Sequence, residues 1–516
     1  MRNRSFVRGA FILTIANIVD RGIGFVFRII LSNLLGSEGT GIYQISLPIY
    51  FVSITFITSG ITAVVSRFIS EERAKGNKRN IFNIMKVSFI IVFIIGFLIS
   101  AVLFFNAKYI AENILHEPRA YLAILIYSPV LIIVSSSSIF KGFFQGFINM
   151  IPASISEIVE QIVRVSLTLY LFSIYTGIKV EYTVAIAIFG IAIGEVISFL
   201  MYVFFYRSER RYIDKELNDN GGNLSCFYIG KSIIYTSMPI TFSKMIVNIL
   251  DLFESLIIPQ RLIISGLTHK EAVSEYGKLS GMAYPLAYMP AVITMSLSIT
   301  ILPAVSEAAA LKQWETVRLR INQAIGYTTM IAFPVIILFL VIPDKISMLL
   351  YPKSPGVAEL VKAIAAGSIF AYMESIVSSI LNGLGRQNVV LRNSVIWTAI
   401  AVVAMYCFVA IPEWRLFGYI YGSIFADALI LILNMFDLIK LTKLRIDYLN
   451  WFIKPIISAA VMGIIVLFLY SQFLTLNLWV NIFLSVIIGT IVYFAINEVL
   501  RLPYIADIKK MILFRN

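Results

Sequence analysis

The chain has 516 residues, of which 59% are hydrophobic and 14% charged, and its mean hydropathy is +0.87. An ordinary soluble domain carries about 25% charged residues, so this composition excludes that class and predicts a protein embedded in a lipid bilayer. The net charge of +13 could suggest nucleic acid. Because basic residues collect in the cytoplasmic loops of membrane proteins, we expect no nucleic-acid partner.

The first apolar run follows Met1-Arg2-Asn3-Arg4 and could pass for a signal peptide. However, Asp20 and Arg21 interrupt the run, no small-residue cleavage site follows, and apolar sequence resumes to Leu35. We therefore interpret this run as an uncleaved first transmembrane span.

Apolar runs between charged or Gly/Pro-marked breaks predict an all-α polytopic membrane protein, since one span needs about 20 mostly apolar residues. We predict 14 transmembrane helices. In chain order they cover residues 7–35, 42–69, 85–106, 120–141, 152–175, 183–206, 232–260, 277–307, 323–343, 358–382, 389–411, 416–438, 453–473 and 478–499.

Lysine and arginine residues are shared unevenly between alternate loops. The N-terminus, the loops 70–86, 207–231 and 439–454, and the C-terminus carry most of them, and the opposite set of loops carries few. Lysine and arginine stay on the cytoplasmic side of membrane proteins. We therefore predict that both termini are cytoplasmic and that residues 207–231 form a cytoplasmic linker loop.

Two short motifs recur in the second half of the chain with nearly the same spacing. Val65-Ser66 is echoed by Val305-Ser306, and the segment from Ser138 to Gly142 is echoed by the segment 379–383. Their shared order predicts an internal repeat.

The repeat predicts two six-helix lobes, an N-lobe at residues 1–206 and a C-lobe at 232–440. Because six spans return the chain to its starting side, the repeat is parallel, with its pseudo-axis along the membrane normal. Residues 441–516 have no counterpart and hold two appended helices and a cytoplasmic tail.

Charged residues interrupt the first span. A charge at the centre of a span costs roughly 2.5–3.5 kcal/mol, so such residues usually face a bundle interior or a wet cavity. Arg21 and Arg28 share one helix face and could present two cations to a cavity. Alternatively, Asp20 forms an internal ion pair with one of them.

The fifth span carries Glu157, Glu160, Gln161 and Arg164 on one stripe. Glu160 and Arg164 have the spacing of a favourable ion pair on a helix. A structural pair and a contact with substrate both remain open for these residues.

The seventh span carries Lys244, Asn248, Asp251 and Glu254 near one face. Two carboxylates and an amide suit a cation or proton site, and they equally suit pairing with Lys244. One interpretation is that these residues bind Na⁺ or H⁺ and couple transport to its gradient. We expect no other cofactor.

Four further charges lie singly within or near spans, and their roles stay open: Glu195, Lys278, Glu374 and Asp427. Both histidines, His116 and His269, fall in predicted outward loops. No intramembrane histidine is therefore available for a metal site, and we predict none.

Motifs of common enzymes are missing from the sequence. It has no G-x-x-x-x-G-K-[ST] phosphate loop, and neither G-x-S-x-G nor H-E-x-x-H occurs. We therefore expect a protein that is not an enzyme and does not use ATP directly.

Several stretches resemble a known family. They are the segment from Asp20 to Arg28, Gly36-Ser37-Glu38-Gly39, Leu47-Pro48, the run from Lys141 to Gly146, and Glu160-Gln161 with Arg164. These residues resemble the stage V sporulation protein B and polysaccharide biosynthesis group. That group belongs to the multidrug/oligosaccharidyl-lipid/polysaccharide (MOP) exporter superfamily, which includes lipid II flippases.

The resemblance implies a flippase in the bacterial cell membrane. Its cargo would be an undecaprenyl-pyrophosphate-linked glycan such as the peptidoglycan precursor lipid II, and its partners membrane lipids and cell-wall synthesis proteins. The appended helices would form a groove for the lipid tail. Arg21 and Arg28 fall on the motif whose arginines contact pyrophosphate in relatives. The segment 39–47 lacks the family's charges and has only Gln44 as a strongly polar side chain, which leaves a different lipid-linked glycan open.

Two sets of candidate residues follow. The predicted substrate-binding residues are Asp20, Arg21, Arg28, Gln44, Glu160, Arg164 and Lys278. The predicted coupling-ion residues are Asn248, Asp251, Glu254 and Asp427. Two alternative functions remain, a multidrug/cation antiporter of the same superfamily and a membrane-embedded glycan polymerase or ligase.

Overall fold

The computed structural model describes residues 6–216, 224–473 and 477–505. The basic residues predicted to hold both termini in the cytoplasm, at 1–5 and 506–516, lie outside this part, as does the middle of the predicted linker loop. Within the described residues every regular element is a helix and no strand occurs. The predicted all-α class is confirmed.

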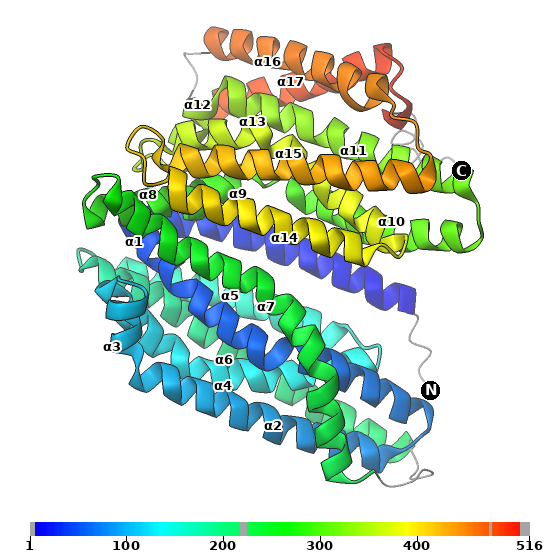
Figure 1. Cartoon of the computed structure of the whole chain (residues 1–516). Helices are drawn as coiled ribbons and strands as arrows, with labels where there is room; N and C mark the ends of the chain where they lie inside the picture. The colour runs from blue at the N-terminus through cyan, green and yellow to red at the C-terminus, as the bar shows by residue number, and fades with distance from the viewer. Residues whose placement is uncertain (1–5, 217–223, 474–476, 506–516) are drawn as a thin grey trace. The chain divides into compact units, whose positions relative to one another are not determined.

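The chain divides into two compact units, Met1–Pro259 and Gln260–Asn516. The helices that begin in the first unit are α1 (Phe6–Ala74), α2 (Lys78–Phe105), α3 (Ala107–Tyr109), η1 (Ile110–Ile114), η2 (Pro118–Ala120), α4 (Tyr121–Gly146), α5 (Ile151–Ile174), α6 (Val180–Glu216) and α7 (Cys226–Ile264) (Figure 1).

The second unit contains a longer series of elements. They are α8 (His269–Gly277), η3 (Lys278–Ala283), α9 (Tyr284–Ala287), α10 (Ala291–Ala310), α11 (Trp314–Val341), α12 (Pro343–Leu350), α13 (Val357–Gly383), α14 (Gln387–Val403), η4 (Ala404–Phe408), α15 (Arg415–Thr442), η5 (Leu449–Ile453), α16 (Lys454–Gln472) and α17 (Leu478–Val499).

Ten helices of the described chain are long and apolar enough to cross a membrane. The first extends over Val19–Ala74 and contains the second predicted span and the latter part of the first. Neither α5 nor α7 belongs to this set. Helix α5 carries three charged residues, Glu157, Glu160 and Arg164. The count of 14 spans therefore stays a prediction.

The first two predicted spans are joined in α1 across a kink at Gly36. Its φ of 69° and ψ of 178° are not helical, and glycine adopts a positive φ without the steric penalty of a side chain. The sequence predicts a break at this place, and the structure makes it a kink rather than a loop.

Proline residues break the predicted span 277–307. The π-helical turn η3 and the short helix α9 precede a turn that ends at Pro290, and α10 begins at Ala291. Proline has no backbone N–H to donate within a helix. The structure therefore divides the predicted span into separate helical elements.

The prediction of a loop at residues 207–231 is wrong for the described part of this segment, which is largely helical. Helix α6 continues to Glu216 and α7 begins at Cys226. Arginine, glutamate and lysine are good helix formers, so polarity alone predicts the end of a span but not the end of a helix.

The two units repeat one packing pattern. In the first unit α4 packs against α1, α2 and α6, and α5 packs against α6. In the second unit α13 packs against α10, α11 and α15, and α14 packs against α15. In the predicted repeat α13 is the counterpart of α4, so equivalent helices make equivalent contacts.

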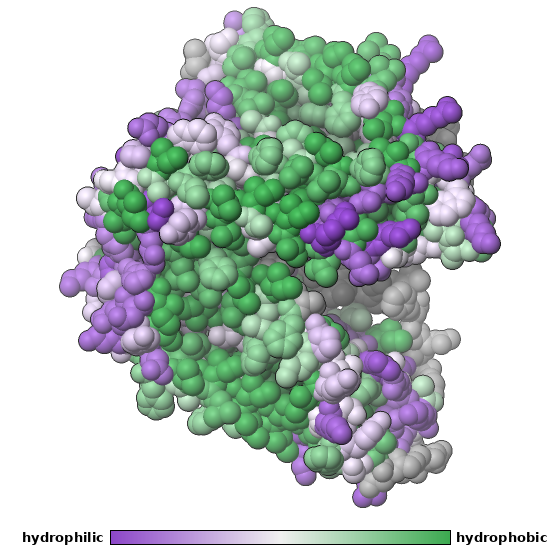
Figure 2. Space-filling model, in the orientation of Figure 1, coloured by the Kyte–Doolittle hydropathy of each residue, from purple (hydrophilic) through white to green (hydrophobic). Residues whose placement is uncertain are grey.

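Large apolar side chains are exposed on both units. Examples are Phe97 and Leu98 on α2, Ile464 and Phe468 on α16, and Phe483 on α17. Hydrophobic residues cover much of the visible face of each unit, and hydrophilic residues gather toward the helix ends (Figure 2). Such extensive exposed apolar surface is unfavourable in water, and with the apolar helices it identifies a multi-pass membrane protein.

Candidate functional site

Helix α5 carries a polar stripe that is paired within the first unit. The Arg164 guanidinium forms an ion pair with Glu160, one turn away on the same helix. The Lys141 ammonium of α4 forms an ion pair with Glu157. Both carboxylates are therefore compensated, and the pair favoured by the spacing of Glu160 and Arg164 is present.

The first half of α1 lies along this stripe. A Cβ added at Gly24 would be 3.5 Å from Nε2 of Gln161 on α5. Asp20 is half-buried and interacts electrostatically with Glu157, Arg164 and its neighbour Arg21. Asp20, which precedes the two predicted pyrophosphate-binding arginines, therefore belongs to the same polar cluster as the charged residues of α5.

The two predicted pyrophosphate-binding arginines, Arg21 and Arg28, are exposed within the first unit. Tyr43 of α1 is half-buried and interacts electrostatically with both Arg164 and Arg28. Gln44 beside it is also half-buried. The interactions of Tyr43 place it between Arg28 and the polar stripe of α5.

Glu195 of α6 joins the same cluster. The Tyr50 hydroxyl donates a hydrogen bond to Glu195 Oε1 over 3.5 Å. The sequence identifies Glu195 as a lone intramembrane charge but assigns it no neighbour, because Tyr50 is far away along the chain.

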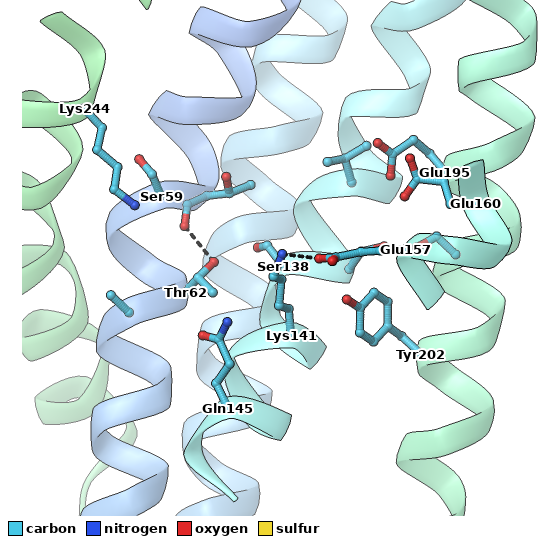
Figure 3. Close-up of a pocket in the computed structure, with 15 residues that line it drawn as sticks. Ser59, Thr62, Ser138, Lys141, Gln145, Glu157, Glu160, Glu195, Tyr202 and Lys244 are labelled. Atoms are coloured by element: carbon cyan, nitrogen blue, oxygen red, sulfur yellow. Dashed lines mark hydrogen bonds and ion pairs between the residues drawn. The ribbon is translucent and has the colours of Figure 1, made fainter. Parts of the chain in front are cut away.

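The polar cluster opens into a cavity of about 440 Å³ within the first unit (Figure 3). Its walls come from α1, α4, α5, α6 and α7. The lining residues are Thr58, Ser59, Thr62, Ala63, Val134, Ser137, Ser138, Lys141, Gln145, Glu157, Glu160, Glu195, Ser198, Tyr202 and Lys244.

One predicted substrate-binding residue, Glu160, lines this cavity. The other candidates of the first unit lie outside its lining, namely Asp20, Arg21, Arg28, Gln44 and Arg164. Sequence reasoning missed the serine and threonine residues of the walls. The run Ser135 to Ser138 in an otherwise apolar span is the one sequence feature that could have indicated them. It is not specific, because small hydroxyl residues are also common where membrane helices pack together.

The predicted coupling residues of α7 have different surroundings. The Asn248 side-chain amide donates a hydrogen bond to Thr55 Oγ1 of α1 over 2.7 Å. Asp251 is exposed, Glu254 is half-buried, and Lys244 lines the cavity. Among the described residues no group of three His, Cys, Asp or Glu side chains could hold a metal ion.

In the second unit the predicted site residues have local partners. Lys278, with 14% of its side chain exposed, forms an ion pair with Glu275 over 2.8 Å. The Trp397 indole N–H donates a hydrogen bond to Asp427 Oδ1 over 2.7 Å. The fold therefore separates Lys278 and Asp427 onto different helices and gives each a neighbour.

A buried polar network that the sequence does not predict links α13, α14 and α15. Glu374 Oε1 accepts hydrogen bonds from the Ser378 hydroxyl over 2.5 Å and from Asn434 Nδ2 over 3.3 Å. Asn393 Nδ2 donates to Asn434 Oδ1 over 2.6 Å, and both asparagines are fully buried. The network satisfies groups that apolar packing would leave without partners.

The sequence matches the family described as polysaccharide biosynthesis protein over residues 6–309, more than half of the chain. The chain belongs to this family. The predicted resemblance is thereby confirmed, and the polysaccharide biosynthesis family places the chain in the MOP exporter superfamily, in the group related to lipid II flippases.

Two relatives of this polysaccharide biosynthesis family member come from Bacillus subtilis (strain 168). Stage V sporulation protein B is 28% identical over 447 residues, which cover 86% of this chain and 86% of that protein. Lipid II flippase MurJ is 24% identical over 430 residues, which cover 77% of this chain and 76% of that protein.

Solved structures share the fold of this chain. A lipid II flippase MurJ in an inward closed conformation matches with a TM-score of 0.67 at 14% identity, covering 95% of this chain and 98% of that chain. An inward-facing multidrug resistance MATE family transporter matches with a TM-score of 0.68 at 14% identity, covering 82% and 94%. At these identities the likeness concerns the fold alone.

Proposed function

We propose that the protein is a flippase that moves an undecaprenyl-pyrophosphate-linked glycan from the inner to the outer leaflet of the bacterial cell membrane. The similarity to stage V sporulation protein B and to lipid II flippase MurJ over most of the chain supports this class of transporter. Lipid II is the first candidate for the cargo.

The observation that carries the proposal is the pair of exposed arginines on a helix that is otherwise rich in apolar residues. Arg21 and Arg28 are exposed on α1, and a guanidinium inside a membrane span needs water or an anion as its neighbour. The planar fork of arginine can hold two oxygens of a pyrophosphate at once. An arginine pair on a first span therefore suits a pyrophosphate-linked cargo.

The proposed architecture has 14 transmembrane helices, with two six-helix lobes and two appended helices. Two glycines support the repeat. A Cβ added at Gly142 would lie 2.8 Å from the Thr62 carbonyl oxygen, and one added at Gly383 would lie 2.8 Å from the Leu302 carbonyl oxygen. If the two lobes are copies of one unit, these two glycines occupy equivalent positions, and each should lie against the backbone of the equivalent neighbouring helix.

In the proposed mechanism, the two lobes alternate between inward and outward access. The sugar headgroup crosses inside the protein while the polyprenyl tail stays in lipid, which avoids moving sugars through hydrocarbon. A cation gradient or the membrane potential would supply the energy, with Asn248, Asp251, Glu254 and Asp427 as the residues to test for coupling.

The fold also supports an alternative function, a multidrug/cation antiporter, because the chain resembles a multidrug resistance MATE family transporter. A cation antiporter needs a site rich in acidic and aromatic residues and does not need arginines on the first span. The effect of removing Arg28 therefore separates the two functions.

The test follows labelled lipid II in proteoliposomes as it becomes accessible to an external reagent. Loss of a hydrogen bond to a charged group weakens an interaction by roughly 1.5–3 kcal/mol, so we expect Arg28→Ala to slow the movement about tenfold or more. Arg211→Ala, which removes an exposed arginine near the end of α6, is the matched control. Equal rates for wild type and Arg28→Ala would show that the arginine site is wrong, and failure to move any lipid-linked glycan would refute the flippase proposal.

A further inference from the structure

The cavity of the first unit is lined by hydroxyl groups whose protons are already used. Thr58, Ser59 and Thr62 each donate to a carbonyl one turn earlier in α1. Ser137 and Ser138 donate in the same way within α4. A hydroxyl that donates to its own helix keeps its lone pairs. These walls of the cavity therefore present hydrogen-bond acceptors.

The charges around the cavity largely neutralise one another. Lys141 pairs with Glu157, and Glu160 pairs with Arg164 just outside the lining. The third lining carboxylate, Glu195, accepts a hydrogen bond from the Tyr50 hydroxyl. In the part of the chain that the structure describes, Lys244 has neither a hydrogen bond nor an ion pair, and its ammonium reaches toward Ser59 (Figure 3). The cavity thus suits an uncharged polar ligand with one anionic group near Lys244.

The size of the cavity also indicates the kind of ligand. A volume of 440 Å³ corresponds to about fifteen waters at roughly 30 Å³ each. A single bound ion needs only a few oxygen ligands around it. Small-molecule sites occupy roughly 300–1,000 Å³, so the space fits an organic group with several polar atoms.

We propose that this cavity binds a sugar unit of the lipid-linked glycan, with Lys244 contacting the adjoining phosphate. The proposal rests on the proposed flippase function and adds a site for the sugar beside the arginines of α1. Sugar hydroxyls donate to the serine and threonine oxygens and to the carboxylates, and they accept from Lys141 and from the Gln145 amide.

The position of the lining residues is consistent with loading from the cytoplasm. Lys141 and Gln145 belong to the last turns of α4, and Glu157 lies near the start of α5. Four predicted spans separate the loop between these helices from the predicted cytoplasmic N-terminus, so we expect this loop to be cytoplasmic as well. A sugar bound here would be held before it crosses.

The test measures the accessibility of the cavity to a charged thiol reagent. A Ser138→Cys variant is made with the natural cysteines, Cys226 and Cys407, changed to serine, and the protein is placed in nanodiscs. The matched control is Ser173→Cys, because Ser173 is an exposed serine that also donates to its own helix. Labelling is timed with and without lipid II.

We expect lipid II to protect the Ser138→Cys variant and not the control. At ten times its Kd the ligand leaves about one site in ten free, so labelling should slow about tenfold. Undecaprenyl pyrophosphate, which lacks only the glycan, should give no protection. Adding Lys244→Met should require about tenfold more lipid II for the same protection, since a bond to a charged group is worth about that factor.

Three labelling results would overturn the sugar site. Equal protection by undecaprenyl pyrophosphate would assign the cavity to the pyrophosphate or lipid, and protection by Na⁺ alone would assign it to a cation. Absence of protection, in protein that still moves lipid II in proteoliposomes, would refute the sugar site and leave the flippase function standing. If no lipid-linked glycan moves at all, both proposals fail. Ser59→Cys on the opposite wall repeats the test if Ser138→Cys does not fold.

Discussion

At the scale of single residues, the ion pair between Glu160 and Arg164 accounts for two charges inside an apolar unit. Glu160 has 15% of its side chain exposed and Arg164 has 22%. The spacing of one helical turn predicts this contact. The sequence could not predict the pair between Lys141 and Glu157, because it joins two helices whose register depends on packing.

We predict that Arg164→Met destabilises the protein, because it leaves the Glu160 carboxylate without its cation. Breaking a buried pair from one side costs about 3–5 kcal/mol, which a thermal unfolding curve in detergent should register as a lower Tm. The double change Glu160→Gln with Arg164→Met should recover part of the loss.

The control is the pair between Arg67 and Glu71, which has the same spacing on α1 but is exposed, at 66% and 46%. An exposed pair contributes roughly 0–1 kcal/mol, so Arg67→Met should hardly move the Tm. Equal Tm shifts for Arg164→Met and Arg67→Met would contradict the assigned role of the buried pair.

At the scale of helices, small residues decide how closely the elements approach. Gly142 of α4 faces the backbone of α1, and Gly383 of α13 faces the backbone of α10. The sequence relates these two glycines through their shared motif. It could not show what each glycine touches, since that depends on which helices become neighbours.

We predict that Gly142→Ala and Gly383→Ala destabilise the protein to a similar degree. In each variant the new methyl group would press on a carbonyl oxygen of the neighbouring helix, and such overpacking costs about 1–3 kcal/mol. The Tm of each variant in detergent is the measurement. Gly22→Ala is the control, because nothing lies within 4 Å of the added Cβ, and a large difference between the two repeat positions would argue against their equivalence.

The ends of helices show where sequence patterns are weak. Gly36 marks the kink in α1, at the break that the sequence predicts between the spans 7–35 and 42–69. The polarity of residues 207–216 predicts a loop, but in the structure these residues belong to α6. Hydropathy reports where a segment leaves the membrane, while helix propensity decides where the backbone stops being helical.

At the scale of the whole molecule, the uneven distribution of lysine and arginine predicts how the chain crosses the membrane. Cys226 is exposed at the start of α7, within the predicted cytoplasmic linker 207–231. In a Cys407→Ser variant it is the only cysteine. We predict that a membrane-impermeant maleimide labels this variant in permeabilised cells and leaves it unlabelled in intact cells.

The control places a cysteine on the predicted outer side. Thr176 is exposed in the short segment between α5 and α6, and Thr176→Cys in a protein without the natural cysteines should be labelled in intact cells. Labelling of Cys226 from outside would reverse the predicted orientation of both termini.

The sequence by itself determined the membrane class, the family and the order of the apolar segments, because hydropathy, charge distribution and short motifs are local properties of the chain. Only the tertiary structure brought Tyr50 to Glu195, Thr55 to Asn248, and the hydroxyl residues of α1 and α4 around one cavity. Such contacts depend on how helices distant in sequence pack, and in the first unit that packing gathered the polar residues into the candidate site.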